Sequence, residues 1–286
     1  MHETNDIREA LDLVTPKASR IRAVATTGRK QTEDAVTLAR WAAAHAGIPY
    51  IERRNRSSAA LREHYGAEFL LVAKHGLLTL ETPHGDLFFH PNMAHLRLKN
   101  LRFGSGGEGD RMVEAMGLVR GMHVLDCTLG FGADAIVASF AVGPEGSVTG
   151  VESEPLIETV VGYGLQHFKA ENWPMQEAMR GVHTVCDEAA HYLKTLPEKS
   201  FDVVYFDPMF RHPLMESRSL TPLRTVANYA AITPAMIEDA CRVARHRVVF
   251  KENARSHEFA RLGFSHIMGG RYSKVHYGVR ILDETN

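Results

Sequence analysis

The sequence has no excess of charge of either sign: its 286 residues carry 33 Lys and Arg against 34 Asp and Glu, a formal net charge of −1. Any nucleic-acid site must therefore be local. The chain is also poor in cysteine. Cys127, Cys186 and Cys241 are too few and too scattered for a disulfide framework or a CxxC zinc site, which is typical of a reducing compartment.

Long apolar runs are missing too, since none approaches the roughly 20 residues that cross a bilayer. The first residues, MHETNDIREALDL, are polar and acidic where a secretory signal would be basic and then apolar. We therefore expect a cytoplasmic protein with no membrane partner. The 16 histidines show no HExxH or comparable spacing, so no metal is expected. With 44% hydrophobic residues the chain can bury a core, which excludes intrinsic disorder.

Charge and glycine divide the chain in two. Residues 1–102 hold 15 Lys and Arg against 11 Asp and Glu, and residues 103–286 hold 18 against 23. The glycine-rich stretch FGSGGEGD begins at this junction, so we predict a small N-terminal domain over 1–102 and a second domain over 103–286. The positive balance of the first domain hints at RNA docking, and packing support is an equally good interpretation.

Hydrophobic periodicity predicts an α/β or α+β fold for the first domain. Its expected elements are a strand at 21–28, a helix at 33–47, and short strands within 68–82 and 86–91. A short helix is expected at 112–118, after the glycine-rich stretch.

Strand and helix patterns alternate from residue 121 onwards. Strands are expected at 123–128, 147–153, 182–187, 201–208 and 246–253. Helices are expected at 134–142, 154–170 and 188–196, and near 233–244 and 255–262. Two last strands, 264–270 and 274–282, are joined by a tight turn. The alternation predicts an α/β fold with a doubly wound, Rossmann-like parallel sheet that ends in an antiparallel hairpin.

The strongest chemical signal follows the first of these strands, in DCTLGFGADA. Gly130 and Gly132 let the backbone approach a ligand closely, and the helix beginning near Ala133 offers free N–H groups. GFGADA also satisfies the loose dinucleotide fingerprint, which alone is a weak signal.

Carboxylates near this turn help to choose the cofactor. Asp126 precedes the glycines and Asp134 follows them, where a pyrophosphate would need neutral or positive surroundings. The pair suits a ligand with an ammonium and a sulfonium group, such as S-adenosylmethionine. Glu152, which ends the second strand, can accept hydrogen bonds from both ribose hydroxyls of any nucleoside cofactor.

Polar residues also end the third strand. Of Cys186 and Asp187, the aspartate can hydrogen-bond an adenine amino group in the crevice at the strand ends. A helix follows directly, so an N-cap is an equally good interpretation of Asp187.

The fourth strand ends in Asp207-Pro208-Met209-Phe210. Methyl transfer to an exocyclic amine needs an acceptor that orients the amine, and Asp207 can be that acceptor. Pro208 would stiffen the turn, and Phe210 offers a ring on which a flipped-out base can stack. The competing interpretation is a strand-ending turn with a core phenylalanine.

Basic residues form three groups that can neutralise phosphates without reading bases. They are Arg53-Arg54-Asn55-Arg56; Arg97, Lys99 and Arg102; and Arg242, Arg245, Arg247 and Lys251. A solvated face explains such groups equally well, so they favour RNA binding only weakly.

These segments resemble the small-subunit ribosomal RNA guanine-N2 methyltransferase family. DCTLGFGADA, the acid in VESEP, YFDPMFRHP and RVVFKEN occur in that family's order, and FGSGGEGDRMVEAMG resembles its glycine-rich lead-in. LARWAAAHAGIP extends the likeness weakly into the first domain. The resemblance implies a class I methyltransferase sheet of seven strands, S-adenosylmethionine as the methyl donor, and a guanine amine in ribosomal RNA as the acceptor.

The resemblance also implies cofactor contacts at seven positions. They fall on Ala133, Asp134, Glu152, Ser153, Cys186, Asp187 and Asp207.

The leading hypothesis is therefore an S-adenosylmethionine-dependent RNA methyltransferase acting on an exocyclic amine. In it, Asp126 holds the ammonium end of the donor or its own turn, and Asp207 lies between cofactor and substrate. Three alternatives stay open: a methyltransferase of protein or small-molecule amines, a nicotinamide-dependent oxidoreductase, and a non-catalytic RNA-binding protein.

Overall fold

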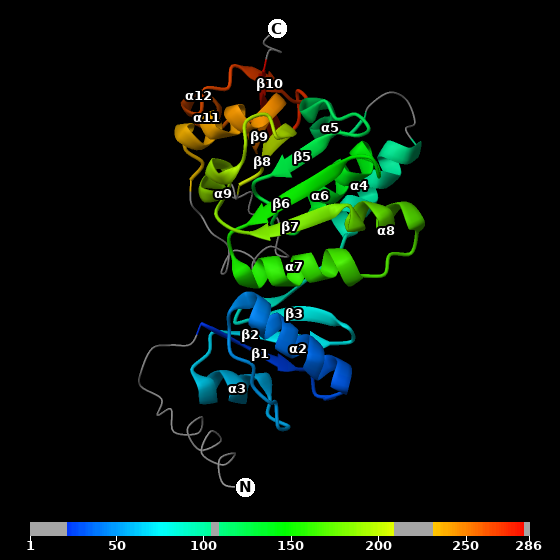
Figure 1. The fold of residues 1–286 in the computed structure, drawn as a ribbon, viewed down its shortest axis with the longest axis vertical. Coiled ribbons are helices and arrows are strands. Elements are labelled where there is room, and N and C mark those ends of the chain that lie inside the picture. Colours follow the sequence, from blue (N-terminus) through cyan, green and yellow to red (C-terminus); the bar gives the residue numbers. More distant parts are fainter. Residues whose placement is uncertain (1–21, 104–108, 209–230, 283–286) are drawn as a thin grey trace. The chain divides into compact units, whose positions relative to one another are not determined.

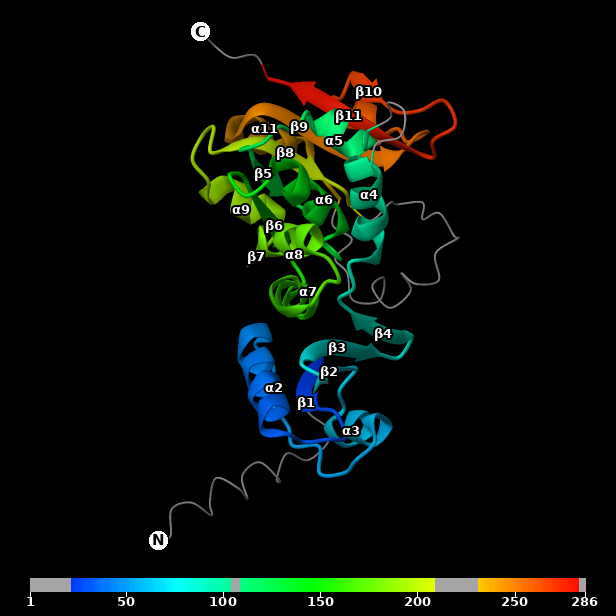
Figure 2. The same cartoon turned by 90° about the vertical axis from the view of Figure 1, so that its right-hand side faces the viewer.

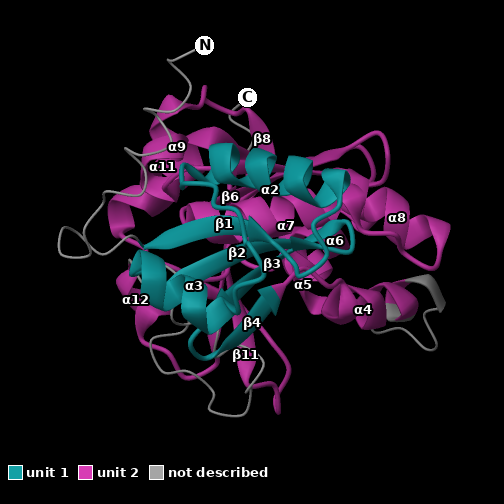
Figure 3. Cartoon of the chain, turned by 90° about the horizontal axis from the view of Figure 1, so that it is seen from below, with its two compact units in different colours: residues 1–87 teal, residues 88–286 magenta. Residues whose placement is uncertain are grey.

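The computed structural model describes residues 22–103, 109–208 and 231–282. Its residues form two compact units, Met1–Leu87 and Phe88–Asn286, which are coloured separately in Figure 3. Helix α4 (Asn92–Phe103) belongs to the second unit, whereas the boundary expected after residue 102 places it in the first. Arg97 of α4 pairs with Asp134 of the second unit, which fixes the helix there.

Unit 1 contains a four-stranded sheet in the order β1-β2-β3-β4. Its strands are β1 (Ala23–Thr27), β2 (Phe69–Lys74), β3 (Leu77–Thr82) and β4 (Gly85–Phe88), and its helices are α2 (Glu33–Ala46) and α3 (Ser58–Tyr65). β1 and β2 run parallel, and β2 and β3 antiparallel. The run 68–82 forms two strands, because His75 (φ 55°) and Gly76 (φ 72°) take up the left-handed conformations of a tight hairpin turn.

Unit 2 begins with two helices and continues with the alternating strands and helices that the sequence predicts (Figure 1). Its helices are α4, α5 (Arg111–Met116), α6 (Ala133–Val142), α7 (Pro155–His167), α8 (Trp173–Arg180), α9 (Ala189–Thr195), α11 (Pro234–Val243) and α12 (Glu258–Arg261). Its strands are β5 (His123–Asp126), β6 (Ser147–Glu152), β7 (Val182–Cys186), β8 (Phe201–Phe206), β9 (Ala244–Asn253), β10 (His266–Met268) and β11 (Val275–Ile281).

These strands form one seven-stranded sheet in the order β10-β11-β9-β8-β5-β6-β7. The pairs from β9 to β7 are parallel, and β11 is antiparallel to both β9 and β10. The predicted doubly wound sheet with a C-terminal antiparallel hairpin is thus confirmed. Helix α8 was not expected; Asn172 caps it and Pro174 stands in its first turn, which are ordinary start signals.

Helices cover both faces of this sheet, with α9 and α11 on one side and α4 and α6 on the other (Figure 2). The core under α9, α11 and α12 is built from residues that alternate along the strands, such as Leu125, Val204, Phe206 and Phe250. Among the described residues, no helix is both long and apolar enough to cross a membrane.

Candidate functional site

The candidate site lies where β5, β6, β7 and β8 end. β5 pairs with β6 on one side and β8 on the other, so the order of connection reverses between β5 and β8. Open α/β sheets bind ligands in the crevice at such a reversal. Asp126, Glu152, Cys186 and Asp207 all stand at or just after these strand ends, so the topology brings the predicted residues to one edge.

The glycine turn is held in a conformation that L side chains rarely adopt. Gly130 has φ 50° and Gly132, the N-cap of α6, has φ 74°. Leu129 anchors the turn, because its N–H donates to the carbonyl of Val151 at 3.0 Å. A Cβ on Gly150 of β6 would lie 2.5 Å from Leu129 Cδ1. The glycine in β6 therefore leaves the room that Leu129 needs.

Asp126 is only 2% exposed and holds its own turn. Its Oδ1 accepts from the Thr128 N–H at 2.9 Å and from Thr128 Oγ1 at 3.2 Å. Burial, together with the nearby Asp134 and Asp207, raises the pKa of Asp126 to about 7. The sequence left two roles open for Asp126, holding the ammonium end of the donor or holding its own turn. Its contacts with Thr128 belong to the second role.

Glu152 ties the end of β6 to the glycine turn. Its Oε2 accepts from the Gly130 N–H at 3.1 Å, and its Oε1 accepts from the Glu154 N–H at 2.9 Å. Burial raises the pKa of this carboxyl group. Each carboxylate oxygen has a second lone pair, so the two contacts leave acceptor capacity for ligand hydroxyls. Ser153, the next residue, is half-buried.

Every described contact of Asp134 is with another group of the protein. It pairs with Arg97 of α4, accepts from Lys251 Nζ at 3.0 Å, and accepts from Tyr205 Oη at 2.6 Å. Burial opposes ionisation, but Lys251 and Arg97 outweigh it and hold the pKa of Asp134 below its usual range. The carboxylate therefore neutralises a buried cationic pair in this structure, and its predicted contact with a cofactor stays a prediction.

Asp207 lies directly after β8 and is oriented by two neighbouring strands. Its Oδ2 accepts from Lys251 Nζ at 2.7 Å, and its backbone N–H donates to Thr128 Oγ1 at 2.6 Å. Burial and Asp134 raise the pKa of Asp207 to about 6, against the opposing effect of Lys251. Its side chain is 28% exposed, so a ligand at the strand ends can reach it.

Cys186 and Asp187 end β7 beside Glu152. Cys186 pairs with Glu152 in the sheet register, and partial burial and nearby carboxylates raise the pKa of its thiol to about 11. Asp187 accepts from the Glu188 N–H and from His191 Nδ1, both at 2.7 Å. The N-cap of α9 is Glu188, so the N-cap interpretation of Asp187 is wrong by one position.

Of the two other residues singled out in the DPMF segment, one lies within the described residues and one does not. Pro208 follows Asp207 and is half-buried. Phe210 lies outside the described residues, so stacking of a base on its ring stays a prediction.

Sequence reasoning missed the partners that hold the predicted acids. Thr128 links Asp126 to the backbone of Asp207, and Lys251 bridges Asp134 and Asp207. Arg97 joins Asp134 to Asp110, the N-cap of α5. Lys251 carried a usable signal, since a lone lysine at the end of the buried run RVVF needs acidic partners.

Most of the basic residues grouped as phosphate contacts are engaged within the protein. Arg53 is 5% exposed and donates to the carbonyl of Thr27 at 2.8 Å. Five more hold backbone carbonyls or acids: Arg97, Arg242, Arg245, Arg247 and Lys251. Contact between phosphates and these basic groups stays a prediction, and these internal partners favour it no further.

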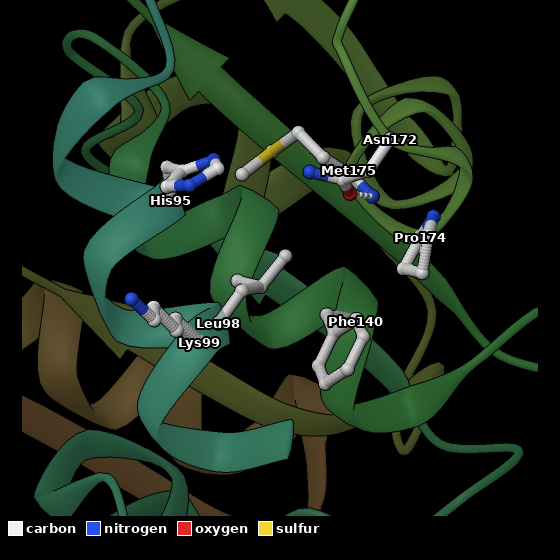
Figure 4. Close-up of a pocket in the computed structure, with 7 residues that line it drawn as sticks. All are labelled: His95, Leu98, Lys99, Phe140, Asn172, Pro174 and Met175. Carbon is white, nitrogen blue, oxygen red and sulfur yellow. Dashed lines mark hydrogen bonds between the residues drawn. The ribbon is translucent and has the colours of Figure 1, made fainter. Parts of the chain in front are cut away.

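A small pocket lies elsewhere in unit 2. Its volume is about 250 Å³, and α4, α6 and the start of α8 line it with mainly apolar atoms (Figure 4). His95 and Lys99 of α4 stand at the pocket, and Asn172 there accepts from the Met175 N–H at 3.1 Å. None of the strand-end carboxylates lines it, so it is separate from the candidate site.

The sheet order β10-β11-β9-β8-β5-β6-β7, with the glycine turn after β5, is that of the class I methyltransferase fold. Residues 56–274 match the family model described as "Putative SAM-dependent methyltransferase". The chain belongs to this family of S-adenosylmethionine-dependent methyltransferases. The family match also favours S-adenosylmethionine over the nicotinamide alternative.

The chain is also similar to sequence relatives and to a solved structure. The chain is 37% identical over 254 residues to the uncharacterized protein YpiP of Bacillus subtilis, covering 89% of this chain and 97% of that protein. It is 28% identical over 220 residues to ribosomal RNA small subunit methyltransferase J of Dechloromonas aromatica, covering 73% and 86%. The fold is similar to that of a SAM-dependent methyltransferase from Neisseria gonorrhoeae, with TM-score 0.62 and 18% identity over 91% of this chain and 95% of that one.

The strand-end residues fit S-adenosylmethionine. Gly130 leaves an open approach, because a Cβ there would meet only the carbonyl oxygen of Thr128, at 3.9 Å. Gly132 caps α6 without a side chain, so the first-turn N–H groups of the helix are not covered by a capping oxygen. Glu152 retains acceptor capacity at the position where a ribose lies in such sheets.

Proposed function

We propose that this methyltransferase modifies the exocyclic N2 amine of a guanine in ribosomal RNA. The observation that carries the proposal is Asp207, a reachable carboxylate directly after β8 whose orientation is fixed by Lys251. The relatives named ribosomal RNA small subunit methyltransferase J support RNA as the substrate class.

Three groups of this chain would hold the cofactor. The turn at Gly130 and Gly132 lets the backbone approach it, Glu152 accepts from its ribose hydroxyls, and Asp187 accepts from its adenine amine. Asp126 keeps the turn in shape through Thr128. Bound S-adenosylmethionine supplies an electrophilic methyl group on a positively charged sulfur.

Asp207 performs the positioning step. In the transfer that the bound cofactor would support, the amine nitrogen would form the new N–C bond, the electron pair of the broken S–C bond would stay on sulfur, and the nitrogen would release one proton. A carboxylate that accepts an N–H of the amine aims the lone pair at the methyl group and can take that proton on its way to solvent. With its pKa raised to about 6 by burial, Asp207 is mostly ionised at neutral pH.

The experiment uses the full chain, S-adenosylmethionine and small-subunit ribosomal RNA, with nucleoside mass spectrometry as the readout. Wild-type protein should produce N2-methylguanosine. Asp207→Ala should lower kcat by about 10²–10⁴-fold, because the amine loses its orienting acceptor. Binding of S-adenosylhomocysteine, measured by calorimetry, should stay within about threefold of wild type.

Full activity of Asp207→Ala would overturn the role of this residue. Methylation of a protein or small-molecule amine with no RNA product would overturn the substrate class and favour the alternative enzyme on the same fold.

A further inference from the structure

The connection between β10 and β11 stands at the same edge of the sheet as Asp207. β11 runs antiparallel to β9, and its first residue, Val275, pairs with Asn253, the last residue of β9. The residues before Val275 therefore extend past the end of β9, where Lys251 holds Asp207.

This loop, residues 269–274, presents an aromatic ring to solvent. Tyr272 is 90% exposed, compared with 74% for Trp173 and 42% for Trp41. The Arg271 guanidinium carbon lies 5.7 Å from the centre of its ring, which is a cation–π distance. Tyrosine is enriched at contact surfaces because its ring offers apolar area while its hydroxyl can stay hydrated, so an exposed ring beside the proposed catalytic edge favours a contact there.

The loop is nevertheless well anchored. Ser273 donates its N–H to the Gly270 carbonyl at 2.9 Å and its hydroxyl to the Val275 carbonyl at 2.6 Å. The Ala254 N–H donates to the Lys274 carbonyl at 3.0 Å, which ties the loop to the residues after β9. The exposed ring is thus carried by a loop that several hydrogen bonds hold in place.

Cationic side chains belong to the loop and to the segments beside it. Arg271 and Lys274 belong to the loop, Arg255 follows β9, and the Arg111 guanidinium lies against Gly270; all four are exposed. We call Arg111, Arg255, Arg271, Tyr272 and Lys274 the loop rim.

Three acids that neighbour the loop rim in the sequence are engaged or buried. Asp110 pairs with Arg97, Glu258 pairs with Arg261, and Glu252 is only 5% exposed. The loop rim itself contains four cationic side chains and no acidic one. It also differs from the basic groups singled out in the sequence, whose members are mostly turned to internal partners.

We infer that the loop rim is the surface that grips the RNA strand beside the target base, with Tyr272 stacking a neighbouring unpaired base and the cations binding phosphates. This inference rests on the proposed function and adds the place where the substrate docks. Single-stranded nucleic acid is bound by this combination, since stacking tolerates any base and cations track the backbone.

The test compares paired variants of the full chain. Tyr272→Ala is matched by Trp173→Ala, which removes another exposed ring (74%) at the start of α8. Arg271→Ala/Lys274→Ala is matched by Lys169→Ala/Lys194→Ala, which removes two exposed cations, one after α7 and one in α9. The probe is a fluorescein-labelled, single-stranded 20-nucleotide RNA, read by anisotropy between 50 and 200 mM salt.

Tyr272→Ala should weaken RNA binding by about 5- to 150-fold, the equivalent of one lost base stack. The double arginine–lysine variant should lower the slope of log K against log salt by about 1.4, which corresponds to two lost contacts with single-stranded phosphates. Both control variants should bind RNA as wild type does, and all four should bind S-adenosylhomocysteine normally.

The outcomes separate this inference from the proposed function. If wild type methylates ribosomal RNA and both loop-rim variants bind RNA as tightly as their controls, the inference is overturned and the function stands. RNA binding that depends on the loop rim without any methylated nucleoside would leave the inference and overturn the function. Absence of RNA binding by wild type would overturn the inference, and the methylated nucleoside alone would decide the function.

Discussion

The ammonium group of Lys251 lies 2.7 Å from a carboxylate oxygen of Asp207. The same nitrogen lies 3.0 Å from Asp134, so one cation on β9 serves two acids at the edge where the chemistry is proposed. Both acids raise the pKa of this lysine against the effect of burial, so it stays charged at every ordinary pH. Lys251 therefore orients Asp207 and lowers its pKa, against the opposing effects of burial and Asp134.

The first prediction concerns the acid limb of the pH profile. Asp207 must be ionised to accept the amine proton, and burial raises its pKa to about 6, so kcat should fall about tenfold per unit below pH 6. Lys251→Met removes the cation that lowers this pKa. The pH at which kcat begins to fall should therefore rise by one unit or more. Lys251→Arg keeps the charge and should leave the limb near its wild-type position. Identical limbs in wild type and Lys251→Met would contradict the assignment.

The second prediction concerns the ion pairs of Arg97, which join α4 to α6 and to the N-cap of α5 within unit 2. Arg97 is three-quarters buried by side-chain area and pairs with Asp110 and Asp134. Arg97→Ala leaves both acids without this partner and should lower the free energy of unfolding by about 2–4 kcal/mol.

Arg54→Ala is the matched control, since its pair with Glu52 is largely exposed. Exposed pairs contribute about 0–1 kcal/mol, so the control should unfold near the wild-type urea midpoint. Equal decreases of the urea midpoint in the two variants would show that the burial of Arg97 adds nothing to the stability of the protein.

Much of this architecture could be predicted from the sequence because alternating apolar runs specify a parallel sheet. The glycine turn and the acids after β6 and β8 were placed correctly at the strand ends for the same reason. Arg97 and Asp134 are 37 positions apart, and no local pattern shows that they pair. The pairing of Lys251 depends on the packing of β9 against β8, which only the folded sheet brings about.

Helix α4 shows the limit of periodicity most clearly. Met93 and Leu96 are 66% and 62% exposed, while Ala94 and Leu98 are buried. Its apolar residues therefore do not lie on one face, and an amphipathic pattern cannot be recognised in the sequence.

The third prediction concerns the pH dependence of stability. Burial raises the pKa of Asp126 to about 7, so between about pH 4 and 7 the folded protein holds a proton that the unfolded chain has released. This group therefore makes the protein less stable as pH rises through that window. Asp126→Asn keeps an acceptor for Thr128 and should flatten the loss between pH 5 and 7.5, measured by urea unfolding.

Asp202→Asn is the control of opposite sign. The His123 N–H and Arg245 hold the pKa of Asp202 below its usual range in spite of burial, so its contribution is present above about pH 4 and lost in acid. The variant should lose stability at pH 7.5 and little at pH 3. Changes of the same sign in both variants would contradict the burial argument for Asp126.

The fourth prediction concerns Gly150, which leaves room for the anchor of the glycine turn. In Gly150→Ala the new Cβ would lie 2.5 Å from Leu129 Cδ1, and Leu129 is only 4% exposed, so the turn must shift. Overpacking of this kind costs about 1–3 kcal/mol. Displacing Leu129 also moves Gly130, so the Kd for S-adenosylhomocysteine should rise at least tenfold. Thr149→Ala changes the neighbouring residue of β6 without touching Leu129 and should bind normally. A Gly150→Ala protein that loses stability but keeps wild-type affinity would mean that the position of the turn does not set cofactor binding.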